Sequence, residues 1–218
     1  MAETHCIFEA RSISRRTADS VALLDKVSLS VSAGEKWAVT GPTGSGKTLL
    51  LRALALLDPI DEGALHWKGG AIAADQFPQY RSDVIYLHQR AVLVDGTVED
   101  NLRQPFKLKS SNHKTFDRDA TVDRLARLGQ NASFLEKSAK ELSGGEAQIV
   151  AILRAIQLNP SALLLDEPTS AMDATTVVAF ESLMSDWIAE SPTQRAYVWV
   201  SHDPRQVTRV SDHELQLN

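Results

Sequence analysis

The sequence contains a single cysteine, Cys6, so no disulfide can form within the chain. Small secreted domains depend on paired cysteines, whereas an isolated cysteine suits a reducing cytosol. The longest apolar runs, such as 53–57 and 196–200, have five residues, and a membrane-spanning helix needs about 20. The first ten residues hold two glutamates and a histidine and lack the apolar stretch of a secretory signal. We therefore expect a cytoplasmic chain that does not itself cross a bilayer.

Positive charge is also scarce, with 23 Lys and Arg residues against 28 Asp and Glu residues and a formal net charge of −5. This mild acidity gives no electrostatic attraction toward nucleic acid, and the adjacent Arg15 and Arg16 are too few to form a binding patch. We expect no nucleic-acid partner. The apolar share of 43% and the charged share of 23% are typical of folded proteins and exclude wholesale disorder. A length of 218 residues favours one domain.

Apolar patterning divides the chain into strand-like and helical regions. The first forty residues have the pattern of short strands and turns, and strand-like runs return at 84–87, 162–165 and 197–200. The last two are apolar throughout, as in parallel strands buried on both faces. From about 90 to 160 the spacing is helical. The patterning predicts an α/β core with a helical insert: strands also at 27–31 and 36–40, helices at 49–57, 98–102, 120–128, 145–158 and 174–189, and an exposed loop at 107–119.

A glycine-rich segment, Gly41–Thr48, matches G-x-x-x-x-G-K-[ST] between a predicted strand and a predicted helix. Its glycines let the backbone approach phosphates closely, and the helix N-terminus adds partial positive charge. Lys47 can reach the β- and γ-phosphates, and the Thr48 hydroxyl can bind Mg²⁺. The alternative is a plain glycine-rich turn, but the strand–loop–helix context favours phosphate binding. The predicted binding residues are Gly41, Pro42, Thr43, Gly44, Ser45, Gly46, Lys47 and Thr48.

Two acids, Asp166 and Glu167, follow the apolar strand 163–165. The carboxyl ends of strands are where α/β folds bind ligands, so we expect Asp166 to hold Mg²⁺ and Glu167 to polarise an attacking water. On its own this pattern also fits an ordinary strand followed by a capped turn. The phosphate loop in the same chain favours the functional interpretation.

A second candidate anion site begins at Ser143, which is followed by Gly144 and Gly145 and then by a predicted helix. Ser143 can cap that helix, and the glycines leave backbone N–H groups exposed at its N-terminus. Alone, Ser-Gly-Gly indicates only a turn. Its position shortly before Asp166 makes coincidence a poor explanation.

In combination, these motifs resemble the nucleotide-binding subunit of ABC (ATP-binding cassette) proteins, from about residue 7 to the end of the chain. The resemblance implies the ABC-ATPase form of the P-loop NTPase α/β fold, with a RecA-like, mostly parallel sheet, an N-terminal antiparallel β subdomain and an inserted α-helical subdomain. Residues 1–218 would form one ATP-binding domain, with a core lobe at about 1–89 and 160–218 and a helical lobe at about 90–159. The matching motifs are Walker A (Gly41–Thr48), the Q-loop glutamine (Gln89), the signature (Leu142–Gln148), Walker B (Leu163–Glu167), the D-loop (Ser170–Asp173) and the H-loop histidine (His202).

The resemblance also implies an ATPase that uses ATP and Mg²⁺. Glu167 would activate water, His202 would contact the γ-phosphate, and Gln89 would contact Mg²⁺ or the water, although a histidine after a strand is by itself more often structural. Two subunits, identical or merely similar, would bind two ATP molecules head to tail, with Ser143–Gly145 facing the partner's γ-phosphate. The implied residues are catalytic Glu167, His202, Gln89 and Lys47; metal-binding Thr48, Gln89 and Asp166; and, beyond the phosphate loop, nucleotide-binding Arg16, Ser143, Gly144, Gly145 and Asp173.

Two positions depart from the family pattern. Many members carry an aromatic residue before Walker A that stacks on adenine, and at that place the chain has Arg16. A guanidinium plane can stack on a base instead, so we assign Arg16 to the base. The alternative is that adenine is held loosely, with poor selectivity for the base. After the signature, Gln148-Ile149 replaces the commoner Gln-Arg. Neither change touches the phosphate, Mg²⁺ or water contacts, so we expect an active ATPase.

Among ABC proteins, the chain resembles the energy-coupling subunits of membrane transporters. Apolar residues at 91–94, just after Gln89, would form a groove for the helix of an integral membrane permease, which would hold the chain at the cytoplasmic face of the inner membrane. The stretch 80–102 looks most like stand-alone ATPases of iron- or metal-exporting systems. The alternative is a soluble ABC ATPase that acts as a mechanical or scaffold subunit, for example in iron–sulphur assembly. A small-molecule kinase would leave the signature unexplained.

Overall fold

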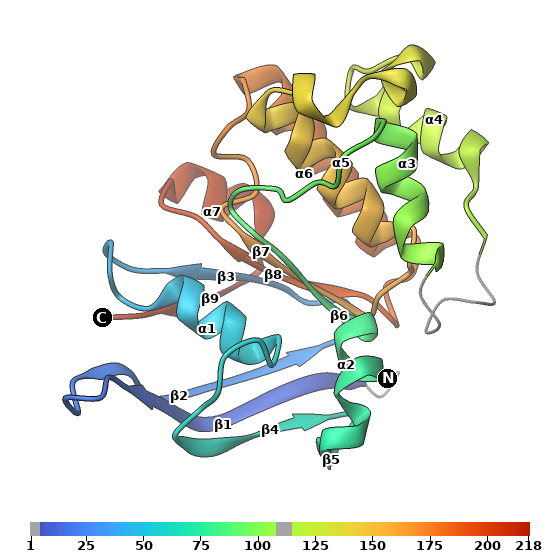
Figure 1. Cartoon of the computed structure of the whole chain (residues 1–218). Coiled ribbons are helices and arrows are strands. Elements are labelled where there is room, and N and C mark those ends of the chain that lie inside the picture. The colour runs from blue at the N-terminus through green and yellow to red at the C-terminus, as the bar shows by residue number, and fades with distance from the viewer. Residues whose placement is uncertain (1–4, 108–114) are drawn as a thin grey trace.

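The computed structural model describes residues 5–107 and 115–218. Its strands form two sheets, one antiparallel and one parallel. Most of its helical residues lie on the side of the parallel sheet that faces away from the antiparallel sheet (Figure 1). No helix in these ranges is both long enough and apolar enough to span a membrane.

The antiparallel sheet has the strand order β2-β1-β4-β5. Its long first hairpin pairs Phe8 with Val31 and Ala10 with Leu29. The sheet is built from β1 (Cys6–Arg16), β2 (Ala22–Ser32), β4 (Glu62–Trp67) and β5 (Gly70–Ala71).

The second sheet has the order β6-β7-β8-β3-β9, and every pair in it is parallel. The phosphate loop follows β3, and Asp166 is the last residue of β7. Both therefore lie at the carboxyl edge of one sheet, where ligands bind in open α/β folds. Its strands are β3 (Lys36–Thr40), β6 (Val84–Leu87), β7 (Ala162–Asp166), β8 (Ala196–Val200) and β9 (His213–Gln216).

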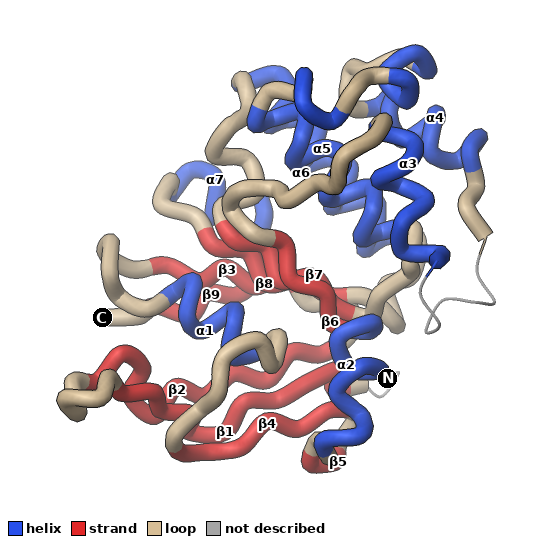
Figure 2. The backbone as a smooth tube through the Cα atoms, viewed as in Figure 1, coloured by secondary structure: helices blue, strands red, loops and turns tan. Residues whose placement is uncertain are grey.

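The helices cover the parallel sheet on both faces. Figure 2 shows α1 between the two sheets and the group α3 to α6 on the opposite side of the parallel sheet. The helices are α1 (Lys47–Leu54), α2 (Phe77–Asp83), α3 (Val98–Arg103), α4 (Arg118–Arg127), α5 (Gly144–Ile156), α6 (Ala174–Ala189) and α7 (Pro204–Val210), with short 3₁₀ turns at Ala74–Gln76, Gln104–Lys107, Ala132–Glu136 and Ala139–Glu141.

The apolar core lies on both faces of the parallel sheet. Along β7, Leu164 packs with α1 and the antiparallel sheet, whereas Leu163 and Leu165 pack with α5 and α6. All five residues of β7 and all five of β8 are buried. This two-sided burial explains why both strands are apolar throughout rather than alternating. It confirms the predicted parallel strands.

The sequence-based elements are largely confirmed, and the crossover helix α6 has the predicted bounds 174–189. The expectation of short N-terminal strands was wrong, because β1 and β2 each have 11 residues. Register shifts at several points along their pairing, together with positive φ angles at Ser12 and Lys26, interrupt the alternation that marks a strand. The helices α2 and α7 were missed. Most of the expected loop 107–119 lies outside the described residues, and Arg118 already belongs to α4.

Candidate nucleotide-binding and hydrolysis site

The loop between β3 and α1 wraps around the amino group of Lys47. This side chain is 6% exposed, and its Nζ donates hydrogen bonds to the carbonyl oxygens of Gly41 and Pro42, each at 2.8 Å. Gly41 has a φ of +141°, and a Cβ at that position would lie 2.3 Å from the carbonyl oxygen of Leu217. Glycine is therefore required there, because any side chain would force the loop away from Leu217, the residue that follows β9.

The loop fits a phosphate group. The hydroxyl oxygen of Ser45 is buried and has no hydrogen-bond partner in the described residues, and buried polar atoms are normally satisfied. The first N–H groups of α1 point in the same direction as the helix dipole and have no acceptor within the helix. The loop opens into a cavity of about 610 Å³, whose lining includes Leu23, Thr43, Gly44, Gly46, Lys47, Thr48, Arg52, Gln89, Glu167 and His202.

Asp166 is held by hydroxyl groups on two elements. The Thr48 hydroxyl donates to Oδ1 of Asp166 at 3.1 Å, and the Tyr86 hydroxyl donates to Oδ2 at 2.8 Å. Asp166 is 2% exposed. Burial of the phenol, the charge of Asp166 and this hydrogen bond raise the pKa of Tyr86 above its usual value, so the phenol stays protonated and keeps donating.

The residues at this position also suit Mg²⁺. A hydroxyl and a carboxylate supply the oxygen ligands that Mg²⁺ prefers, and it commonly takes its remaining ligands from water and phosphates. No group of three His, Cys, Asp or Glu side chains that could hold a metal ion occurs in 5–107 or 115–218. A magnesium site here therefore depends on Thr48, Asp166 and the nucleotide together.

The Glu167 carboxylate is held by two of the three other residues assigned to catalysis, Gln89 and His202. The Gln89 Nε2 atom donates to Oε2 of Glu167 at 2.8 Å, and His202 Nε2 contacts Oε1. The three side chains come from the segment after β6, the end of β7 and the end of β8. Glu167 has a φ of +45°, a strained conformation for a residue with a side chain. The fold thus holds this carboxylate at the cavity even though the backbone of Glu167 is strained.

Ser143 begins α5 with a reciprocal cap. The Glu146 N–H donates to the Ser143 hydroxyl oxygen at 3.2 Å, and the Ser143 N–H donates to the Glu146 carboxylate at 2.8 Å. Lys137 pairs with Glu146 at 2.6 Å. A Cβ on Gly145 would lie 2.8 Å from the carbonyl oxygen of Ala171, so the signature packs against the D-loop. Neither Ser143 nor the two glycines line the cavity that contains Lys47.

Arg16 and Asp173 also lie outside the lining of that cavity. Arg16 is exposed at the end of β1; its backbone N–H donates to Asp61 at 2.6 Å and its guanidinium reaches the Ser20 carbonyl oxygen at 3.4 Å. Asp173 caps α6 by accepting the N–H groups of Thr175 and Thr176, each at 3.0 Å. The Thr176 hydroxyl and N–H lower the pKa of Asp173.

The structure adds three residues to which the sequence patterns assigned no role. Gln148 donates to the His88 carbonyl oxygen and Arg154 donates to the Val92 carbonyl oxygen, each at 2.9 Å. These bonds fasten α5 to the chain on both sides of Gln89. The third is Tyr86. The sequence offers one signal for these three residues: each is a polar side chain within an otherwise apolar stretch of a helix or strand.

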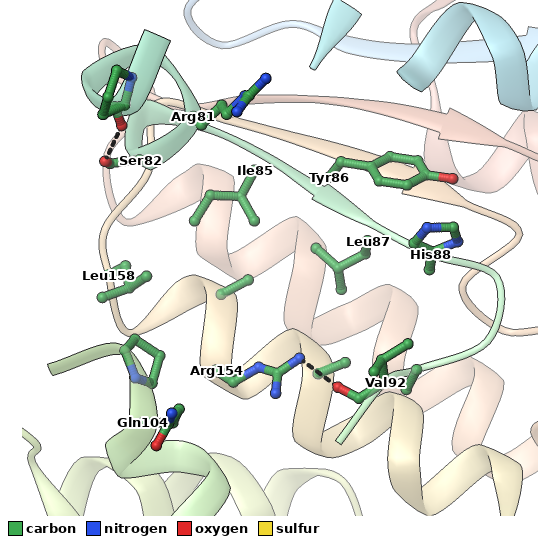
Figure 3. Close-up of a pocket in the computed structure, with 15 residues that line it drawn as sticks. Arg81, Ser82, Ile85, Tyr86, Leu87, His88, Val92, Gln104, Arg154 and Leu158 are labelled. Atoms are coloured by element: carbon green, nitrogen blue, oxygen red, sulfur yellow. Dashed lines mark hydrogen bonds between the residues drawn. The ribbon is translucent and has the colours of Figure 1, made fainter. Parts of the chain in front are cut away.

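A groove of about 490 Å³ runs along the outer edge of β6, between α2 and α5 (Figure 3). Ala91 and Val92 line it as expected, whereas Leu93 packs against the core and Val94 is not part of the lining. Arg154 reaches into the groove from α5.

Comparison with known proteins gives a family and several relatives. The family model described as ABC transporter matches residues 24–170. The probable iron export ATP-binding protein FetA of Escherichia coli (strain K12) is 34% identical over 185 residues, which cover 85% of this chain and 80% of FetA. The lipoprotein-releasing system ATP-binding protein LolD of Chromohalobacter salexigens is 35% identical over 198 residues, which cover 88% and 81%. A dimeric ATP-binding cassette solved in a post-hydrolysis state with ADP and phosphate has a TM-score of 0.82 at 26% identity, covering 97% of this chain and 94% of that one.

Proposed function

This chain belongs to the ABC transporter family as an ATP-hydrolysing, nucleotide-binding subunit, and we propose that it forms one half of a dimer that closes around two ATP molecules. One observation carries the proposal. The described residues include two candidate anion-binding helix N-termini, at α1 and α5, and the residues of the second do not line the cavity of the first. A second subunit arranged head to tail brings Ser143, Gly144 and Gly145 to the phosphates held by the first subunit's loop.

Within each cavity, we assign the phosphates to the loop Gly41–Thr48, with Lys47 on the β- and γ-phosphates. Thr48, Asp166 and Gln89 hold Mg²⁺, which when bound neutralises phosphate charge. Glu167 accepts the proton of the attacking water. His202 contacts the γ-phosphate, Arg16 stacks on the base, and Asp173 takes part in binding the nucleotide.

Glu167 has a protein partner on each carboxylate oxygen. One oxygen accepts from Gln89 and the other contacts His202, so each keeps one lone pair for a water, and the carboxylate cannot turn freely toward it. We propose that the γ-phosphate draws His202 away from Glu167. Nucleotide binding then exposes the base only when a substrate is present.

We further propose that a separate integral membrane permease docks in the groove along β6 and holds the chain at the cytoplasmic face of the membrane. The groove lies between a core lobe, at about 1–89 and 160–218, and a helical lobe, at about 90–159. Closure of the dimer would move one lobe against the other and so act on the docked helix. Nothing in residues 5–107 or 115–218 favours the soluble scaffold alternative.

For the cargo, we propose export of a metal ion. The sequence resemblance of residues 80–102 and the relative named for iron export support this class, while relatives of similar identity are named for phosphate import and lipoprotein release. Iron that stimulates ATP hydrolysis by the assembled complex, when phosphate does not, would support the proposal. The reverse pattern would overturn it.

Purification from detergent-solubilised membranes tests the main proposal. We expect an integral membrane protein to co-purify with the chain and ATP to convert purified Glu167→Gln into a dimer. A soluble partner with no membrane protein would reject the transporter role. A chain that stays monomeric with ATP would reject the sandwich.

A further inference from the structure

The strand β6 is one of the two edge strands of the parallel sheet, and its free edge forms one wall of the groove in Figure 3. Tyr86 is the third residue of this strand and lines the groove together with Ile85 and Leu87. Leu87 and Ile85 pack toward α5, whereas Tyr86 packs with the core that contains α1. The Tyr86 side chain therefore extends from the groove wall to the other face of the sheet.

The far end of this side chain reaches the residue assigned to the metal. The Tyr86 hydroxyl donates to Oδ2 of Asp166 at 2.8 Å, which leaves Oδ1 directed at Thr48. The chain has three tyrosines. The other two, Tyr80 and Tyr197, donate to the backbone carbonyl oxygens of Leu54 and Val210. Tyr86 is thus the one tyrosine whose hydroxyl orients a carboxylate.

We propose that Tyr86 is a positioning residue that orients Asp166 for Mg²⁺ and connects this carboxylate to the groove. The proposal deepens the proposed function, because it gives the groove a mechanical connection to the metal. Gln89, also next to β6, bonds to Glu167, so the two connections end on different acids. A displacement of β6 by an occupant of the groove moves the Tyr86 hydroxyl and with it the orientation of Asp166.

The connection acts on the orientation of the carboxylate, because a terminal carboxylate rotates easily unless both oxygens are held. Hydrogen bonds from residues behind a metal ligand commonly fix its orientation, and removing one typically costs about 10-fold or more in metal affinity. Here the strand that carries the hydroxyl is hydrogen-bonded to β7, which carries Asp166, with Tyr86 paired in register to Leu164. The short path makes the geometry sensitive to movements of β6.

The first test uses Tyr86→Phe, which removes the hydroxyl and keeps the ring. The purified full chain is saturated with a non-hydrolysable ATP analogue and titrated with Mn²⁺, and free Mn²⁺ is followed by electron paramagnetic resonance. We expect Mn²⁺ affinity to fall about 10-fold, with affinity for the analogue in EDTA unchanged. The Mg²⁺ concentration for half-maximal hydrolysis should rise while turnover at saturating Mg²⁺ is preserved.

Tyr197→Phe is the matched control, because it also removes a phenol hydrogen bond, here at a buried tyrosine that donates to the Val210 carbonyl oxygen rather than to Asp166. It should keep the wild-type Mn²⁺ affinity. Wild-type affinity in Tyr86→Phe, or an equal loss in both variants, would overturn the positioning role.

The second test places a probe in the groove. Val92 lines the groove and is 71% exposed, so Val92→Cys in a Cys6→Ser background can carry a bulky maleimide. The label should change Mn²⁺ affinity on the order of 5-fold with Tyr86 present and have no effect in Tyr86→Phe. A label on Val178→Cys, which lies on α6 and is 64% exposed, should have no effect in either background.

An unchanged affinity, or a change that persists in Tyr86→Phe, would overturn the connection to the groove. Neither test needs a membrane partner. Failure to find a permease would therefore reject the proposed function without deciding the role of Tyr86.

Discussion

The Gln89 Nε2 atom lies 2.8 Å from Oε2 of Glu167 and donates a hydrogen bond to it. The two residues are far apart in the sequence, and the adjacent parallel strands β6 and β7 bring them together. His202 contacts the second oxygen of the same carboxylate. The proposed base is therefore restrained from both sides, and the proposed mechanism includes a rearrangement of this group when nucleotide binds.

Glu167→Gln tests the base directly. The amide keeps the shape of the side chain but cannot accept the water proton, so turnover should fall about 10²–10⁴-fold while ATP binding remains. Phosphate release and equilibrium nucleotide binding measure the two effects. Glu136→Gln, an exposed glutamate outside the cavity, is the control. Hydrolysis by Glu167→Gln within a few-fold of the wild-type rate would contradict the assigned role.

Complementation between two inactive variants tests the shared site. Lys47→Ala removes the phosphate-loop cation, and Ser143→Arg blocks the signature. Neither variant alone should form ATP-bound dimers, but a mixture can assemble one composite site in which both motifs are intact. Light scattering measures the dimer, and phosphate release shows whether one site suffices. A mixture that stays monomeric with ATP would be incompatible with a site shared across two chains.

Arg16→Ala tests the base contact. Loss of a guanidinium stacked on adenine should weaken ATP binding by about 1 kcal/mol, roughly fivefold in Kd, and should change the preference for ATP over GTP. Arg15→Ala is the neighbouring control, because Arg15 instead bonds to the Pro59 carbonyl oxygen and Asp61. Equal affinities in both variants would remove Arg16 from the nucleotide site.

The cap of α5 should depend on pH. The hydrogen bond from Lys137 and the N–H of Ser143 lower the pKa of Glu146. A carboxyl with a lowered pKa in the folded state stabilises the fold above its unfolded value of about 4.3, and this contribution is lost as the pH falls through the lowered value. The Ser143 amide resonance should therefore stay constant from neutral pH to about 5 and shift only at lower pH. Glu146→Gln, which retains an acceptor without the charge, should abolish the transition; an identical titration in that variant would contradict this origin.

Asn101 should be important for stability. It is fully buried; its Oδ1 accepts the Val94 N–H at 2.8 Å, and its Nδ2 donates to the carbonyl oxygens of Val94 and Thr97. Asn101→Ala removes the partner of the Val94 N–H and of the Val94 and Thr97 carbonyl oxygens and empties a fully buried site, and it should cost about 3 kcal/mol. Urea unfolding measures the loss. Asn131→Ala, at an exposed helix cap, is the control and should cost about 1 kcal/mol. An equal loss of stability in the two variants would show that Asn101 contributes no more than an ordinary helix cap.

The phosphate loop and the two acids could be located from the sequence because each follows a strand of one parallel sheet. Carboxyl ends of parallel strands meet at one edge, so Thr48 and Asp166 had to lie near each other. Likewise, the uninterrupted apolar residues of β7 and β8 indicate that both faces of these strands are buried. The bulged strand β1 was less predictable, because register shifts remove the alternation on which strand recognition depends.

The contacts behind the site could not be predicted in the same way. Tyr86 lies in an apolar run, and only the pairing of β6 with β7 shows that its hydroxyl reaches Asp166. Gln148 and Arg154 likewise acquire a role only when α5 packs beside the segment 88–92. Such bonds join residues that are far apart in the sequence, so no fixed spacing along the chain predicts them.

The reciprocal cap at Ser143 has a consequence for which amino acids this position accepts. The cap uses a lone pair of the hydroxyl oxygen, and the hydroxyl hydrogen has no part in it, so the same group can turn that hydrogen toward an anion while the helix stays capped. Aspartate caps helices about as well but would present a negative charge and no hydrogen to a phosphate. A hydroxyl residue alone meets both requirements, so Ser143→Thr should be tolerated at this position and Ser143→Asp should be excluded.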